Sequence, residues 1–245
     1  MKKKKRLAIK LSVVVLVTIG IIFFLYENDI RCVRVGHSSQ FSKVQEDSID
    51  IYYSIDTPED TLGLFLDILR KSISANEAFW EKKMGRATVI YCHNQELYLE
   101  YGAENMPAIT RLGTHIIVPS TGIDQELLSH ELSHTEMFNA IDRSWLIYYQ
   151  RLPNWFDEGV ALQFNDSGIY SVESLADIQR WSIAQLRQID KARDFYVNDY
   201  SELLYHYKVS KVEVEKWLQD KSKADLFLLI DEVKSGMDFY QAYQN

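Results

Sequence analysis

The chain has only two cysteines, Cys32 and Cys92, among its 245 residues. So few cysteines exclude a scaffold stapled by several disulfides, and they also exclude a zinc ribbon held by four thiolates. A single disulfide between the two remains open, and so does a pair of free thiols, because the choice depends on the compartment in which the protein folds.

An excess of positive charge is also missing. The formal net charge is −8, although the first ten residues carry six lysines and arginines and no acidic residue. Removing those six positive charges leaves −14 on the rest of the chain. Because binding to a phosphate backbone needs a basic face, this balance argues against nucleic acid as a partner.

The sequence has no repeat of fixed period and no low-complexity tract other than its N-terminal lysines. Its length and its 47% of hydrophobic residues suit one globular domain with a short appendage. Nothing in this composition points to several large domains.

The appendage is predicted at the N-terminus. Residues 1–6 form a basic cluster, and residues 7–26 form an apolar run, interrupted only by Lys10, that is long enough to span a bilayer. The run exceeds the apolar core of a usual signal peptide, and no small-residue cleavage site follows it. We therefore expect a single-pass anchor in the cell membrane, with a cytoplasmic N-terminus and an extracytoplasmic body. Secretion after signal cleavage is the alternative, and the polar residues 27–48 are expected to form a stalk.

Residues 49–245 are predicted to form the globular domain, of the α+β class. A long helix is expected to open at Thr57 and to stop at Gly85. Beyond Ala161 the chain contains few helix breakers and is predicted to be mostly helical. Alternating or short apolar runs predict three strands, over residues 49–55, 87–92 and 114–118.

The stretch that carries chemistry is the H-E-x-x-H pattern formed by His130, Glu131 and His134. Apolar residues at helical spacing predict a helix here, and Thr121 with Asp124 is typical of a capping box at its start. Residues four apart lie on one face of a helix, so both imidazoles can bind a single metal ion. The glutamate then projects beside that pair.

A catalytic zinc ion normally takes three protein ligands, so a third one is needed. Glu158 is the candidate, because it lies 24 positions after His134 in a stretch where Pro153 suits the first turn of a second helix. Gly159 and Ala161 have almost no side chain, and we expect them to let this helix approach the first one closely.

These motifs resemble those of the gluzincins, metallopeptidases that bind zinc through the two histidines of H-E-x-x-H and a glutamate on a following helix. Thermolysin-like enzymes and membrane alanyl aminopeptidases are of this kind. The nearest likeness is to bacterial peptidase MA-like domains, whose second motif reads roughly P-x-W-x-x-E-G-x-A. The likeness covers residues 113–161 at the level of motifs and the rest only in outline. The matching residues are Pro153, Trp155, Glu158, Gly159 and Ala161.

The resemblance implies a zincin-like fold with a small N-terminal sheet. Its edge strand, residues 113–118 here, would lie beside the active-site helix and pair with an extended substrate. Thermolysin-like enzymes also place an aspartate four positions after the glutamate ligand to orient a histidine. That position is Leu162 here, which leaves Asp157 and Asp166 as candidates for the role.

The function expected from these residues is that of a zinc metallopeptidase acting on a peptide or protein substrate. One zinc ion held by His130, His134 and Glu158 would acidify a water molecule and polarise the scissile carbonyl. Glu131 would act as the general base. The resemblance also implies a donor to the oxyanion from the helical region after the glutamate, and we choose Tyr207. Its neighbours are the other candidates, namely Tyr200, Tyr205 and His206.

Two alternatives stay open, and the oligomeric state is left undetermined. The domain could keep the zincin-like fold without catalysis and serve in binding or sensing. It could also be an ordinary helical module in which the motif arose by chance, since Asp157 and Glu158 in a first helical turn are favourable to the helix dipole without any metal. Stoichiometric zinc in the purified protein would exclude this second alternative.

Overall fold

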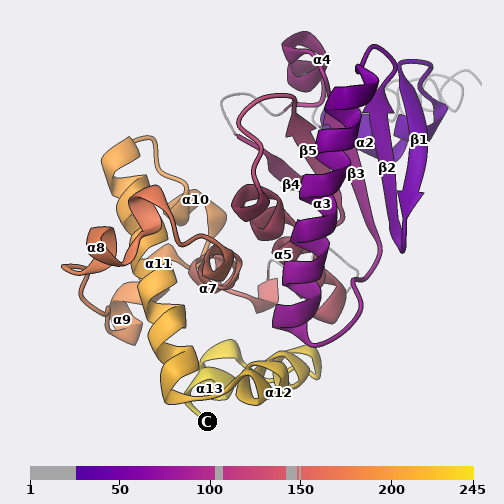
Figure 1. Cartoon of the computed structure of the whole chain (residues 1–245). Coiled ribbons are helices and arrows are strands. Elements are labelled where there is room, and N and C mark those ends of the chain that lie inside the picture. The colour runs from indigo at the N-terminus through magenta and orange to yellow at the C-terminus, as the bar shows by residue number, and fades with distance from the viewer. Residues whose placement is uncertain (1–25, 103–106, 142–147, 149) are drawn as a thin grey trace, which may run out of the picture.

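The structure is a computed structural model that describes residues 26–102, 107–141, 148 and 150–245. Its N-terminal half contains a five-stranded sheet and its C-terminal half is helical, so the predicted α+β class is confirmed. Helix α5 (Gln125–Ile141) runs between the two halves and contacts both (Figure 1).

The sheet has the spatial order β1, β2, β3, β5, β4. The three central strands are parallel to one another, and each outer strand is antiparallel to its neighbour. The three strands predicted from the sequence correspond to the central ones. The bounds are β1 (Phe41–Glu46), β2 (Ile49–Ser54), β3 (Ala87–Cys92), β4 (Ile109–Arg111) and β5 (His115–Pro119).

The edge strand beside α5 is not the one that the sequence predicts. Residues 113–118 are expected at the edge, but β5 lies inside the sheet between β3 and β4. The edge belongs to β4, because Leu112 and Gly113 adopt left-handed backbone conformations, with φ of 51° and 70°, and turn the chain so that β4 and β5 form a hairpin. A strand of three residues is too short to show a period of two.

Residues 27–48 do not form the stalk that their polar composition predicts. Cys32 and Val35 are buried against the central strands of the sheet, and β1 pairs with β2 along its whole length. The few apolar residues here form no periodic pattern, yet Cys32, Val35 and Phe41 cover one face of the sheet. Both Cys32 and Cys92 are free and buried. The elements of this segment are α2 (Glu27–Val33), a 3-10 helix (Val35–His37) and β1.

The predicted localisation in the cell membrane must be corrected. Within the described ranges, no helix combines the length and the apolar character that a bilayer crossing requires. The longest helices there, α3 (Glu59–Trp80) and α11 (Tyr200–Asp220), carry charged side chains at frequent intervals. The basic cluster 1–6 and the apolar run 7–26, apart from Tyr26, lie outside the described residues.

Two helices pack on the face of the sheet that leads to the candidate site. α3 and α5 bury apolar side chains against β2, β3 and β5. α3 begins after Pro58, close to the predicted start, and ends at Trp80 because Glu81 takes a left-handed conformation, with φ of 53°. α4 (Gln95–Glu100) packs against the opposite face of the sheet.

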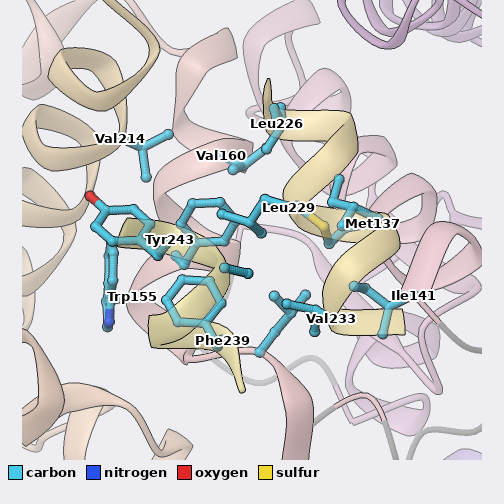
Figure 2. Close-up of a cluster of buried hydrophobic side chains, with 14 of the residues drawn as sticks. Met137, Ile141, Trp155, Val160, Val214, Leu226, Leu229, Val233, Phe239 and Tyr243 are labelled. Carbon is cyan, nitrogen blue, oxygen red and sulfur yellow. The ribbon is translucent and has the colours of Figure 1, made fainter. Parts of the chain in front are cut away.

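The C-terminal half consists of helices joined by short turns. An aromatic-rich core holds them together and includes Met137 and Ile141 of α5, so it also ties this half to α5 (Figure 2). The remaining elements are α7 (Asn154–Ala161), α8 (Val172–Leu175), α9 (Ile183–Leu186), α10 (Ala192–Phe195), α12 (Lys223–Lys234), α13 (Phe239–Gln244) and the 3-10 helices Leu162–Phe164, Gly168–Tyr170 and Arg187–Ile189.

Gly159 allows α7 to approach another helix closely, but that helix is not the predicted one. A Cβ atom at this position would lie 2.5 Å from the backbone oxygen of Ser210, in the middle of α11. The missing side chain therefore brings α7 against α11 rather than against α5. α7 still contacts α5 through other residues.

Candidate metal centre

Helix α5 is held in place before its functional residues begin. The side chain of Asp124 accepts a hydrogen bond from the backbone N–H of Leu127 at 2.8 Å and caps the helix N-terminus. The cap therefore comes from Asp124 and not from Thr121. On the buried side, Asn76 of α3 donates to the backbone oxygen of Ser129 at 3.0 Å, one residue before the histidine motif.

Helix α7 is anchored at its start. Pro153 precedes it in an extended conformation, and the N–H of Asn154 donates to the backbone oxygen of Asp190 at 2.7 Å. Trp155 and Phe156 are fully buried in the aromatic core, so they act in packing. With its start fixed in this way, α7 directs the carboxylates of Asp157 and Glu158 toward α5.

The three predicted metal ligands converge. Nε2 of His130 and Nε2 of His134 are 3.1 Å apart. Oε2 of Glu158 lies 3.4 Å from the first nitrogen and 3.6 Å from the second. Ligands held tetrahedrally at about 2.1 Å from one ion of the size of zinc would be roughly 3.4 Å apart. The three atoms thus match the spacing of one coordination sphere.

The donor atoms also have the chemical character that a cation needs. Oε2 of Glu158 is buried and accepts no hydrogen bond from any residue in the described ranges. A buried carboxylate oxygen that accepts no hydrogen bond is costly, and a cation between it and the two imidazoles would satisfy it. His130, His134 and Glu158 therefore form a buried or nearly buried group that could hold a metal ion.

The charges around His130, His134 and Glu158 favour a positive charge between them. Burial alone would raise the pKa of Glu158, but the neighbouring imidazoles, His134 foremost, hold it well below its usual value. Burial alone would lower the pKa of His134, but Asp157 and Glu158 raise it well above its usual value. Asp157 and Glu158 thus favour a positive charge at this point, which a bound cation would supply.

Asp157 occupies the position of the partner that orients a ligand. Its Oδ1 lies 3.2 Å from Nδ1 of His134 and so leaves Nε2 of that ring facing the centre. Asp166, the other candidate, instead forms an ion pair with Nζ of Lys211 at 3.0 Å. The structure thus distinguishes Asp157 from Asp166, which are equal candidates in the sequence.

Glu131, the predicted general base, is buried to 6% exposure and has a partner that the sequence does not indicate. The hydroxyl of Thr110 in β4 donates to its Oε2 at 2.6 Å. No motif includes Thr110, and the strand that positions it is itself missed in the sequence.

Three tyrosines lie around Glu158, and the predicted one is not its direct partner. The hydroxyl of Tyr196 donates to Oε1 of Glu158. Tyr207 is partly buried, with its ring edge-on to Phe195. Burial, and then the charge of Glu158, raise the pKa of Tyr207 and likewise that of Tyr170.

The other candidates for the oxyanion donor serve elsewhere or face solvent. Tyr200 is 73% exposed and Tyr205 is 41% exposed. Nδ1 of the buried His206 lies 2.8 Å from the backbone oxygen of Phe195, to which it donates. Tyr196 follows α10 without any periodic pattern, so no signal in the sequence marks it.

Comparison with known proteins adds no family name to this geometry. No protein-family model matches the chain, and no curated protein matches it at a significant level.

Proposed function

We propose that this protein is a zinc-dependent metallopeptidase of the gluzincin type, which hydrolyses peptide bonds. The observation that supports this most strongly is the convergence of two Nε2 atoms and one carboxylate oxygen, between 3.1 and 3.6 Å apart. Two imidazoles and one carboxylate are a ligand set typical of catalytic zinc, which keeps a fourth position open for water or substrate.

A zinc ion bound here would supply an acidified water and a Lewis acid for the carbonyl oxygen. Glu131 adjoins His130 in the chain and has a buried carboxylate. In this proposal it accepts the proton of the attacking water and passes it to the leaving amine. Asp157 keeps the ring of His134 oriented throughout.

Tyr207 remains the proposed donor to the oxyanion. The charges of Glu158 and Glu131 both act on its hydroxyl, which supports a location beside the reacting atoms. Because burial and these charges raise its pKa, the hydroxyl keeps its proton at neutral pH and can donate it in a hydrogen bond to a developing negative charge.

The zincin-like fold is part of this proposal, with β4 in place of the predicted edge strand. β4 contacts α5 and is the outer strand of the sheet. An extended peptide could add to its free side and present its scissile bond to Glu131.

The test is a digest of a peptide library by the full chain, with and without a chelator. We expect cleavage that the chelator abolishes and added zinc restores, together with one zinc per chain. Glu131→Gln should keep the zinc and lose turnover. Zinc binding without cleavage would instead indicate a binding or sensing domain, and failure to bind zinc would indicate a chance motif.

A further inference from the structure

Thr110 lies at the junction of two parts of the proposed site. It is the central residue of edge strand β4, and its hydroxyl donates to Oε2 of Glu131 at 2.6 Å. The same hydroxyl lies 3.3 Å from the backbone oxygen of Glu131, so the shorter contact to the carboxylate dominates. This contact joins residues that are 21 positions apart in the chain.

The strand that carries Thr110 is fixed from both sides. Thr110 pairs with Ile116 of β5, and the guanidinium of Arg111 binds Asp29 of α2 and the backbone oxygen of Gly102. The sheet thus places the backbone of Thr110 independently of Glu131.

The turn after β4 is fixed against α5 as well. A Cβ atom on Gly113 would lie 2.2 Å from the ring of Phe138, so the backbone of the turn packs directly on the helix that carries Glu131. Turn and helix are therefore in direct contact at Gly113, three residues after Thr110.

We propose that Thr110 is a positioning residue for Glu131, an inference that rests on the proposed function. By holding Oε2, it restricts the rotation of the carboxylate and leaves Oε1 to accept the proton of the attacking water. A group held in productive geometry contributes to the rate of the chemical step more than to the binding of substrate.

The test compares Thr110→Val with Thr110→Ser. Valine keeps the shape and the strand preference of threonine but lacks the hydroxyl, whereas serine keeps the hydroxyl. We expect Thr110→Val to lower kcat about 10- to 100-fold, the range for a hydrogen bond to a charged group, with KM and zinc content unchanged. Thr110→Ser should keep most of the wild-type kcat.

Thr88→Val is the matched control. Thr88 lies in β3, two residues before Ile90, which faces the side of the sheet away from α5. The Thr88→Val substitution should leave kcat as in the wild type. A second measurement needs no turnover: crystal structures of the metal-free proteins should show Glu131 displaced in Thr110→Val and in place in Thr110→Ser.

The outcomes separate this inference from the proposed function. An active wild type whose Thr110→Val variant has full kcat, or an undisplaced Glu131, would overturn the role of Thr110 alone. Equal damage from the serine and valine variants would do the same. A wild type that binds no zinc, or a fully active Glu131→Gln variant, would overturn the peptidase proposal and this inference with it.

Discussion

Oε2 of Glu158 lies 3.4 Å from Nε2 of His130, although 28 positions and a change of helix separate the two residues. The two helices share the aromatic core, but only α5 also packs on the sheet. α5 packs on the sheet and α3 along one side and reaches the aromatic core with its C-terminal end, whereas α7 is held by that core and by α11. The candidate metal centre therefore forms only when both halves are folded, and metal should stabilise the whole chain by linkage.

Asp157→Asn should weaken zinc binding about 10- to 100-fold, because an amide carries no charge and cannot replace the carboxylate that lies 3.2 Å from Nδ1 of His134. Competition with a chromophoric chelator measures the affinity. Asp166→Asn is the control, since the exposed carboxylate of Asp166 pairs with the buried ammonium of Lys211 and not with the centre. Equal loss of affinity in both variants would contradict the role given to Asp157.

Tyr207→Phe and Tyr196→Phe should fail in different ways. Removing the hydroxyl of Tyr207 should lower kcat about 10²- to 10³-fold at unchanged zinc affinity, as expected for an oxyanion donor. Removing the hydroxyl of Tyr196 frees Oε1 of Glu158, so zinc affinity should fall about tenfold or more. Measuring kcat and zinc affinity in both variants tests this prediction. Full turnover in Tyr207→Phe would show that the role proposed for Tyr207 is wrong.

Both thiols should be unreactive in the native protein. Burial raises the pKa of Cys32 to about 12 and raises that of Cys92 as well. Because the thiolate is the reactive form, DTNB at pH 8 should label neither cysteine until denaturant is added, when two thiols per chain should react. Labelling of one thiol without denaturant would contradict the burial of α2 against the sheet.

The raised pKa of Cys32 also makes the stability of the fold depend on pH. A thiol with a folded pKa above its unfolded value of about 8.5 stabilises the fold below that value and loses this contribution as the pH rises toward 12. The free energy of unfolding should therefore fall between pH 9 and pH 12 less steeply in a Cys32→Ala variant than in the wild type. Urea titrations at several pH values measure this, and parallel curves would contradict it.

The ligands of the candidate centre could be predicted because their spacing follows from helix geometry. His130 and His134 must share a face on any α-helix, and Glu158 is one of few acidic residues at a suitable distance after them. Strands β2, β3 and β5 could be predicted for a similar reason, since each is five or six residues long and mostly apolar.

The other residues of the site depend on contacts between distant segments. Thr110 reaches Glu131 only because a left-handed turn brings β4 back along β5, and Tyr196 reaches Glu158 across 38 positions. Within residues 27–48, Cys32 and Val35 fill single places on the face of the sheet, and β1 pairs with β2 although its sequence is mostly polar. None of these contacts repeats along the chain, so no period or motif encodes them.

Gly159→Ala and Gly63→Ala form a matched pair that tests how α7 is seated. At Gly159 a Cβ atom would meet the backbone oxygen of Ser210 at 2.5 Å, so alanine should lower the free energy of unfolding by about 1–3 kcal/mol and weaken zinc binding by shifting Glu158. Gly63, inside α3, has open space around it, and alanine there should raise that free energy by about 0.5–1 kcal/mol. Urea denaturation of the metal-free proteins measures both changes. A Gly159→Ala protein as stable as Gly63→Ala would mean that α7 does not pack on α11 in this way, and the position of Glu158 would then lose its support.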